Sequence, residues 1–461
     1  MSKRIRVIGG GLAGPEAALQ AAARGYAVDL FEMRPTRSTE AHQTSDFAEL
    51  VCSNSLKSES PDTAPWLLKQ EMRLAGCFLL ADADATAVPA GHALAVDRVA
   101  FSASVAKRLA EEPNITIHRE EVRDLSAHHA DVTILASGPL TSAPLTEALQ
   151  EITGAEHLAF YDSISPIVDA STIDMDKVYL AARWDKGTAD YINCPLTKQE
   201  YDAFIDALVS AENVEAKEWE KLQYFEGCLP IEETARRGRD TLRFGPMKPA
   251  GLTNPKTGRW PYACVQLRCE NLRADSYNLV GFQNHLKFGE QSRILRMIPG
   301  LEHATFLRYG QIHRNTYIHA PSLLTETLQL RARPDLFIAG QLSGVEGYTE
   351  SIASGMLAGR FAAQLLAGDR LVAAPRASAH GSLIHYITHA ETKKFQPANI
   401  TFDLLPPLED ELRARIRDKK ERHRLQCECA LQAWSVWLDK KKTASTTLPA
   451  SGDGDAVLIE R

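Results

Sequence analysis

The first 32 residues alternate between short apolar runs and a segment of small residues. Ile5 to Ile8 is apolar, residues 13–23 are rich in alanine, and Val28 to Phe31 is apolar again. Two short apolar runs on either side of a helical segment predict a β-α-β unit. The alternation continues to about Gly138, and the later elements are a helix capped by Asp97 and strands over 115–118 and 132–136.

A glycine-rich turn joins the first strand to the first helix. Residues 9–14 read Gly-Gly-Gly-Leu-Ala-Gly and fit the dinucleotide-binding pattern G-x-G-x-x-G. In such a turn Gly9 permits the tight bend, Gly11 lets a pyrophosphate approach the backbone, and Gly14 lets helix and strand pack closely. Glu32 ends the second strand, where an acid accepts hydrogen bonds from ribose hydroxyls. We therefore predict an FAD or NAD site formed by Gly9, Gly10, Gly11, Leu12, Ala13, Gly14 and Glu32.

The pattern changes after Gly138. Up to about residue 300, strand-like pieces over 262–267 and 278–282 are broken by helices and by Gly and Pro turns. Thr197 and Glu200 have the spacing of a capping box, which predicts the start of a helix. This middle stretch is expected to be an inserted α+β domain.

A Rossmann-like signature returns at Leu336 to Gly340, followed by a helix rich in Ser, Ala and Gly over 349–366. This distal element resembles the one by which flavoproteins hold the FAD ribityl chain and ring, so FAD is favoured over NAD. Its candidate contacts are Gly340, Gln341, Gly344 and Gly347. The predicted fold class is α/β, an FAD/NAD(P)-binding Rossmann-like domain of the glutathione-reductase type. Its predicted limits are 1–154 and 301–442, with an insertion over 155–300 and a disordered tail over 443–461.

Composition and charge narrow the class of protein. The 461 residues include 52 Lys and Arg against 59 Asp and Glu, a net charge of −7, so nucleic-acid binding would need a local basic surface. No apolar stretch reaches the 18 residues of a membrane span. Eight cysteines without a Cys-x-x-Cys pair argue against disulfides and zinc ribbons. We expect a cytoplasmic protein and predict no metal site.

Two cysteines lie among loop-forming residues. Cys52 is in Glu49 to Ser55, and Cys228 is in Phe225 to Pro230. A free cysteine is usually a small buried hydrophobe, and the others are expected to be so. These are Cys77, Cys194, Cys264, Cys269, Cys427 and Cys429, the last two on different faces of a predicted helix.

The motifs around both cysteines closely resemble the folate- and FAD-dependent tRNA (uracil-5-)-methyltransferase family, TrmFO. The resemblance runs to about residue 440 and extends more weakly to the larger wobble-uridine flavoproteins. The distal loop of this chain, residues 341–344, reads Gln-Leu-Ser-Gly, whereas Gln-Ile-Thr-Gly is common in the family. The motifs are Ala41-His42, FAELVCSNSL over 47–56, FEGCLPIE over 225–232, DTLRFGPMKP over 240–249, RMIPGL over 296–301, HRNT over 313–316 and residues 340–351.

The resemblance implies a particular chemistry. A thiolate that adds to carbon 6 of uracil makes carbon 5 nucleophilic. Methylenetetrahydrofolate supplies carbon at the formaldehyde level, so two further electrons are needed. The resemblance implies that FAD carries carbon and electrons and that NADPH or NADH reduces it.

The resemblance also implies residue roles. Cys228 becomes the uracil nucleophile and Cys52 the base or acid for the carbon 5 proton, although the two roles could be exchanged. His313 would stack on the pterin at the flavin face. Tyr348 and Glu346 would either contact the flavin or cap the distal helix.

The implied RNA partner is tRNA, with the T-loop uridine as target. A base buried there must be extruded, which costs a few kcal/mol. One basic group lies close to Cys228 in sequence and would offset phosphates: Arg236, Arg237, Arg239, Arg243 and Lys248. A second group is expected to be a solvated helix face: Arg413, Arg415, Arg417, Lys419, Lys420, Arg422 and Arg424.

Three alternatives stay open. An rRNA-specific branch shares the motifs, so the same chemistry could act on an rRNA uridine. The chain could instead be an NAD(P)H-linked flavin oxidoreductase of a small molecule, or a non-catalytic RNA-folding module that retains FAD. In the leading hypothesis the active site lies at the junction of the two domains.

Overall fold

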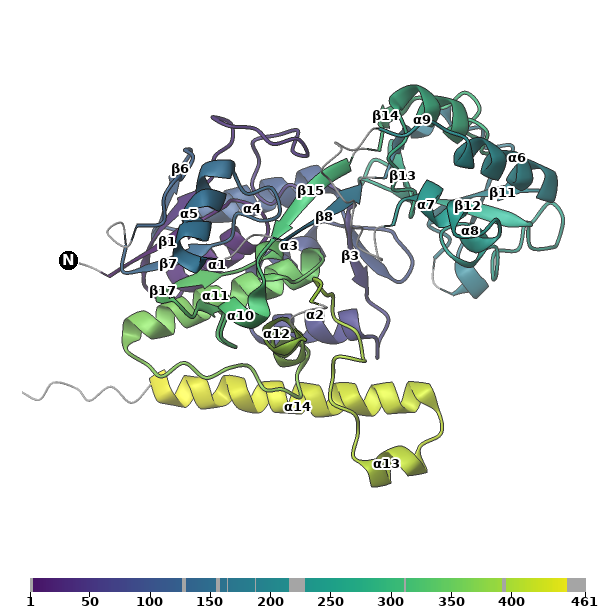
Figure 1. Ribbon diagram of the computed structural model, residues 1–461. Coiled ribbons are helices and arrows are strands. Elements are labelled where there is room, and N and C mark those ends of the chain that lie inside the picture. The colour runs from purple at the N-terminus through teal and green to yellow at the C-terminus, as the bar shows by residue number, and fades with distance from the viewer. Residues whose placement is uncertain are drawn as a thin grey trace, which may run out of the picture.

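The computed structural model describes residues 3–126, 130–154, 158–163, 165–186, 188–214, 229–310, 312–391 and 395–445. Two of the described sheets have six strands each. The one near the N-terminus accompanies the larger hydrophobic core and is called the larger sheet here. The other, called the smaller sheet, accompanies the smaller core and lies at the far side of the molecule with helices α6 to α9 around it (Figure 1).

The described strands of the larger sheet run in the order β16-β17-β7-β1-β2-β6. Its centre is parallel, because Ile5 of β1 pairs with Val28 of β2 on one side and Val132 of β7 on the other. Only β16 runs antiparallel within these described strands. The bounds are β1 Arg4–Ile8, β2 Ala27–Phe31, β6 Ile115–His118, β7 Val132–Leu135, β16 Gln329–Leu330 and β17 Arg333–Ile338.

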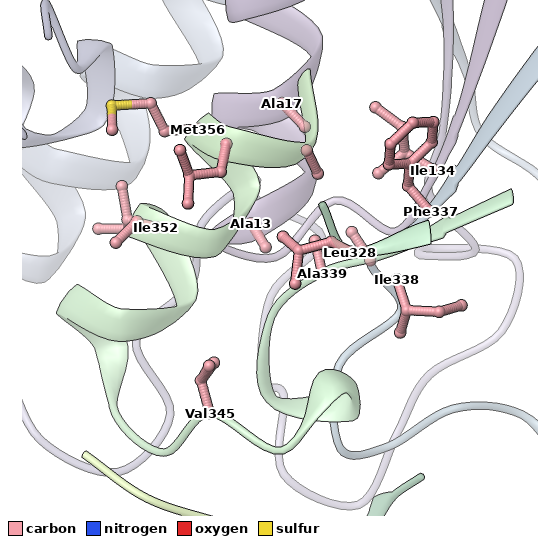
Figure 2. Packing of buried hydrophobic residues seen from close by; sticks show 14 of the residues in the cluster. Ala13, Ala17, Ile134, Leu328, Phe337, Ile338, Ala339, Val345, Ile352 and Met356 are labelled. Atoms are coloured by element: carbon pink, nitrogen blue, oxygen red, sulfur yellow. The ribbon is translucent and has the colours of Figure 1, made fainter. Parts of the chain in front are cut away.

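Helices α1 (Ala13–Ala22) and α11 (Tyr348–Ala367) cross in close contact beside this sheet, as Figure 2 shows for Ala13 and Ala17 against Ile352 and Met356. A Cβ on Gly355 would lie 2.3 Å from the Ala13 carbonyl oxygen, and one on Gly359 would lie 2.3 Å from that of Ala17. The small residues of the distal helix are therefore needed for helix packing.

The smaller sheet is antiparallel and, within the described ranges, has the order β10-β11-β12-β13-β9-β14. The predicted capping box is confirmed at α6, where Thr197 accepts from the Glu200 N–H and Glu200 accepts from Thr197. The bounds are β9 Ile167–Asp169, β10 Tyr179–Ala181, β11 Tyr191–Leu196, β12 Ala263–Cys269, β13 Ser276–Leu279 and β14 Phe306–Arg308. Its helices are α6 Lys198–Val209, α7 Ile231–Arg236, α8 Thr241–Phe244 and α9 Phe288–Leu295.

Strand β13 ends at Leu279, whereas the sequence predicted a strand over 278–282. The chain turns at Gly281, which has a φ of +74°, a conformation that suits glycine and ends the strand. This part of the prediction was wrong by three residues at the C-terminal end.

Two separate hydrophobic cores accompany the two sheets. The larger core draws on residues 5–149 and 317–437, and the smaller one on residues 168–304. Strands β8 (Leu158–Ser163) and β15 (Ile312–Tyr317) pair antiparallel between them (Figure 1). The predicted domain limits at 154/155 and 300/301 stay a prediction, and β14, which follows residue 300, pairs with β9 of the smaller sheet.

The other described elements cover the larger sheet and its edges. A small antiparallel sheet has the order β3-β5-β4, with β3 Ser55–Ser58, β4 Ala87–Val88 and β5 Ala93–Val96. The helices are α2 Ala64–Leu74, α3 Phe78–Ala85, α4 Arg98–Glu111, α5 Ala143–Thr153, α10 Ala320–Leu323, α12 Ala379–His389, α13 Asp410–Arg415 and α14 Lys419–Ser445. Helix α14 continues into the segment predicted as a tail, and residues 446–461 lie outside the described residues.

A buried carboxylate attaches the C-terminal helices to α2. Glu71 accepts hydrogen bonds from the backbone N–H groups of Ala379 and His380, at 2.7 and 3.0 Å. Its carbonyl oxygen accepts from the Trp434 indole at 2.7 Å. A negative charge at the N-terminus of α12 is favourable because the unpaired N–H groups there are partially positive.

Candidate dinucleotide site and cysteine loop

A cavity lies at the carboxyl ends of β1, β2 and β7. It encloses about 1030 Å³ of space, part of it open to solvent. In parallel α/β sheets ligands bind at this edge. The main lining segments are 8–13, 31–34, 120–122 and 136–142, together with Gly340, Gln341 and Tyr348.

The three spaced glycines of the turn have the geometry that the pattern predicts. Gly9 has a φ of +115°, and a Cβ there would lie 2.3 Å from the Ala136 carbonyl oxygen. A Cβ on Gly14 would lie 1.8 Å from the Gly9 oxygen. At Gly11 the space is open, since no protein atom lies within 4 Å of such a Cβ. The turn therefore leaves room for a ligand at Gly11.

Glu32 is buried beside the turn with its acceptor sites in use. Its Oε1 accepts from Arg34 N and Nε at 2.9 Å, and its Oε2 accepts from Gly10 N at 2.8 Å and from Arg34 Nη2 at 3.2 Å. Burial alone would raise the pKa of Glu32, but the bonds from Arg34 and Gly10 lower it, so the group is ionised. A ribose hydroxyl could replace the longest of these bonds, that from Arg34 Nη2.

These residues fit a dinucleotide. The open backbone at Gly11 suits a pyrophosphate, and the ionised Glu32 suits a ribose. Gly340 and Gln341, which follow strand β17, complete the wall of the cavity, and their contact with a cofactor stays a prediction. The small side chain of Ala13 lies close to Gly340, since a Cβ on Gly340 would be 3.0 Å from that of Ala13.

The other two distal glycines, Gly344 and Gly347, do not line the cavity, and their backbone conformations suit glycine. Gly344 and Gly347 have φ of +92° and +112°. A Cβ on Gly344 would lie 2.6 Å from Phe395, and one on Gly347 would lie 2.4 Å from Glu350. Their predicted contact with a flavin stays a prediction.

Tyr348 joins the cavity to the Cys52 loop. The Tyr348 hydroxyl oxygen accepts from the backbone N–H groups of Cys52 and Ser53, at 2.7 and 3.2 Å. Burial raises the pKa of Tyr348, so its hydroxyl stays neutral. The predicted alternatives for this tyrosine did not include this role of holding the cysteine loop. Glu346 accepts instead from Gln341 Nε2 at 2.7 Å.

Two arginines have their charge near Cys52. Arg98 donates to Leu50 O and forms an ion pair with Glu270 of the smaller sheet region. Burial lowers the pKa of Arg98, but the charge of Glu270 outweighs it and raises that pKa, and charge on Cys52 acts in the same direction. Burial lowers the pKa of Arg308, which charge on Cys52 opposes. Arg98 Nη2 and Arg308 Nε are buried without a hydrogen-bond partner within the described residues. Two positive charges therefore act on Cys52.

The remaining described cysteines differ from Cys52 in exposure. Cys77, Cys194, Cys264, Cys269 and Cys427 are buried as predicted. Burial raises the pKa of each of these five thiols, which makes them unreactive. The prediction was wrong for Cys429, which is exposed on the face of α14 opposite Cys427. Cys52 is partly exposed.

Two predicted site residues cannot be compared with the structure in the same way. Cys228 lies outside the described residues. His313 is on β15, where it pairs with Asp162 of β8, and its side chain also lies outside the described part. The roles of both residues stay predictions.

Sequence reasoning missed several lining residues. The loop after β7, residues 136–142, forms one wall of the cavity. Its position at the end of a central parallel strand was a usable signal. His42 also lines the cavity, and burial together with the charge of Arg34 lowers its pKa to about 4. This imidazole is therefore neutral at physiological pH.

The first predicted basic group is largely paired with acids. Arg236 pairs with Glu233, Arg239 with Asp202 and Asp206, and Arg243 with Asp240. In the second group, Arg413, Lys419 and Arg422 line another cavity together with His423 and Phe402. Three members of the second group thus line a concave surface, whereas Arg424 pairs with Glu421 and Glu428 along α14, as a solvated helix face would.

Glu232 is a buried acid that follows the Cys228 motif segment. It lies on α7, and its Oε1 accepts from His285 N at 2.7 Å. Its Oε2 has no hydrogen-bond partner among the described atoms. Burial raises the pKa of Glu232 to about 7.

Glu232→Gln should change how stability depends on pH. The folded state holds a proton on this carboxyl that the unfolded state loses above pH of about 4.5, so the free energy of unfolding should fall as pH rises from about 4.5 to 7. The variant should gain about 2 to 3 kcal/mol relative to the native chain between pH 5 and pH 8. Urea unfolding at both pH values measures this gain. Glu147→Gln, exposed on α5, controls for loss of one carboxylate, and an equal gain there would contradict the assignment.

The parallel sheet, the glycine turn and the ionised acid define a dinucleotide-binding protein of the Rossmann-like class. The family described as Glucose inhibited division protein A matches residues 4–370. Similar solved structures are two crystal forms of Aquifex aeolicus GidA, each 17% identical, with TM-scores of 0.67 and 0.66 over 96% of this chain and 78% and 76% of theirs. The predicted fold class is confirmed.

Curated relatives define the family further. The chain is 65% identical to a protein of Koribacter versatilis over 95% of this chain and 98% of the relative. It is 60% identical to one of Solibacter usitatus (94% and 98%) and 54% identical to one of Enterococcus faecalis (92% and 96%). All three are named Methylenetetrahydrofolate--tRNA-(uracil-5-)-methyltransferase TrmFO. The chain belongs to this TrmFO family, which confirms the resemblance. Among the described helices none is long and apolar enough to cross a membrane.

Proposed function

We propose that this chain methylates carbon 5 of a tRNA uridine, with carbon from methylenetetrahydrofolate and with FAD and NAD(P)H as the source of electrons. The supporting observation is the partly exposed Cys52, whose loop is attached by Tyr348 to the wall of a cavity suited to FAD. The names of the relatives support tRNA as the substrate and methylenetetrahydrofolate as the carbon donor.

FAD would be held by the turn at Gly11, by Glu32 and by Gly340 and Gln341. A bound flavin supplies the two electrons that convert a methylene group to a methyl group. The protein's own contribution is to hold the Cys52 loop beside this cavity, through Val51 and Tyr348 of its lining.

Cys52 would move a proton at carbon 5 of the uracil. Its loop is fixed by the two N–H bonds to Tyr348, and the nearby charges of Arg98 and Arg308 stabilise negative charge on its sulfur. Arg98 Nη2 and Arg308 Nε, which have no partner in the described residues, would donate hydrogen bonds to the negatively charged oxygen that forms on the uracil ring. Cys228 would add to carbon 6, as its motif implies.

The T-loop uridine is the proposed target, and the cytoplasm is the proposed compartment. The five buried cysteines, Cys77, Cys194, Cys264, Cys269 and Cys427, are free thiols, which agrees with a reducing compartment. Arg413, Lys419 and Arg422 are the proposed phosphate contacts outside the active site, because these three cations line one cavity in which Asp403 is the one carboxylate among the lining residues.

Transfer of labelled carbon from methylenetetrahydrofolate tests the proposal. Full-length holoenzyme, NADPH and labelled folate are incubated with a tRNA transcript, with the same transcript carrying cytidine at the T-loop position, and with an rRNA transcript. We expect label in the first RNA alone. Label in rRNA alone would identify an rRNA uridine as the target. Flavin reduction without label in any RNA would favour an oxidoreductase of a small molecule.

Tyr348→Phe should slow methylation by about tenfold while flavin stays bound. The variant removes the acceptor of two N–H bonds, each worth about 1 kcal/mol, and so loosens the Cys52 loop. The turnover number for tRNA methylation and the flavin content of the purified variant measure the two effects. Tyr386→Phe removes a hydroxyl that bonds Gln396 O outside the cavity and is the matched control. Equal rates in both variants would remove Tyr348 as a positioning residue.

A further inference from the structure

Two histidines and one glutamate converge on the surface of the C-terminal helices. His385 and His389 lie one turn apart on α12, and their rings stack at 4.3 Å between centroids. Glu326 comes from the segment between α10 and β16. Its Oε1 lies 3.1 Å from His385 Nδ1 and 3.8 Å from His389 Nδ1.

These distances suit one bound ion. A tetrahedral metal at about 2.1 Å from each ligand keeps its ligand atoms roughly 3.4 Å apart, and the two distances from Glu326 Oε1 lie on either side of that value. In the described part of the chain, this is the one group of three His, Cys, Asp or Glu side chains whose ligand atoms all lie within 4.8 Å. Two imidazoles and a carboxylate leave one position for water.

We propose that Glu326, His385 and His389 bind a divalent transition-metal ion with the ligand preference of Zn²⁺. None of the three lines the dinucleotide cavity, so the site is separate from the proposed reaction. Paired imidazoles with a carboxylate favour Zn²⁺ over Mg²⁺ or Ca²⁺, which prefer oxygen ligands. The spacing of the cysteines predicted no metal site, whereas these two histidines lie four residues apart on one helix.

Two features of the protein oppose a bound ion. The guanidinium of Arg376 lies close enough to interact with the charge of Glu326, and its positive charge would repel a cation at this position. His389 Nδ1 also lies 3.2 Å from the His385 carbonyl oxygen and 3.0 Å from Thr388 Oγ1, contacts that an ion would replace. Metal binding would join α12 to the edge of the larger sheet, since Glu326 lies three residues before the start of β16. Bound metal should therefore stabilise the folded chain.

Calorimetric titration with ZnCl₂ tests the site. The tag-free, full-length chain is stripped of metal, kept reduced with a phosphine and titrated alongside His385→Ala, His389→Ala and His303→Ala. His303 is exposed in the smaller sheet region and is the matched control. We expect the native chain and the control to bind one more equivalent of Zn²⁺ than the two α12 variants, whose affinity at this site falls at least about tenfold.

A second measurement keeps the test decisive if a variant is altered in other ways. The melting temperature of metal-free protein checks that each variant is folded, and its rise on addition of Zn²⁺ should be present in the native chain and lost in His389→Gln. The rise should also weaken at pH 5.5, because protonated imidazoles do not bind metal. Equal stoichiometry in all four proteins, or a Zn²⁺-dependent rise that persists in His389→Gln, would overturn the proposal.

Discussion

Cys228→Ala is expected to lose methyl transfer to tRNA by roughly 10³-fold or more and to keep its bound flavin. Without a thiolate at carbon 6 the uracil carbon 5 stays a poor nucleophile, whereas the FAD site is built from other residues. Methylation of a tRNA transcript and the visible absorbance of the purified protein measure the two effects.

Cys429→Ala is the matched control for Cys228→Ala, because it removes an exposed thiol on α14. RNA with fluorine on carbon 5 of the target uracil distinguishes the roles of the two catalytic cysteines. A thiolate can still add to carbon 6 of this ring, but carbon 5 carries no proton to release, so the covalent complex persists. Cys52→Ala should still form the covalent RNA–protein complex, and Cys228→Ala should not. The reverse pattern would exchange the two roles, and full methylation by Cys228→Ala would contradict the nucleophile assignment.

Gly11→Ala is expected to weaken FAD binding by about 100-fold, or about 2.7 kcal/mol, and to leave the fold intact. The added methyl group meets no protein atom within 4 Å, so the only space that it takes is space for a ligand. Flavin content after dialysis and the binding constant of the flavin-free protein give the loss of affinity.

Gly289→Ala is the matched control, because this glycine on α9 also has no atom within 4 Å of the added Cβ. It should retain flavin and gain a little stability, since alanine favours a helix. Retention of flavin by Gly11→Ala at the native level would show that the pyrophosphate does not approach the backbone there.

Local signals accounted for much of the fold. Strand β6 was predicted with its observed ends, because Ile115 to His118 is an apolar-alternating run between a helix and a polar turn. Asp97 accepts from the N–H groups of Val99 and Ala100 as a predicted cap. The end of β13 was missed, because one glycine does not reveal by itself that the chain turns at that point.

The site was predictable only where its residues are close in sequence. The glycine turn and Glu32 belong to one β-α-β unit whose geometry is nearly fixed, so their positions followed from spacing. The role of Tyr348 was missed because its partners, Cys52 and Ser53, are nearly 300 residues away. Arg98 and Arg308 were missed for the same reason, since only the folded chain brings both charges to the cysteine loop.

The segment from Leu50 to Asn54 is anchored on both sides of the molecule. Asn54 Nδ2 donates to Val96 O at 3.0 Å and to Cys269 O at 2.9 Å, and Arg98 bridges Leu50 and Glu270. A rotation of the smaller sheet region relative to the larger one would therefore displace the Cys52 sulfur as well. The position of this cysteine is therefore tied to the relative placement of the two sheets, and not to its own loop alone.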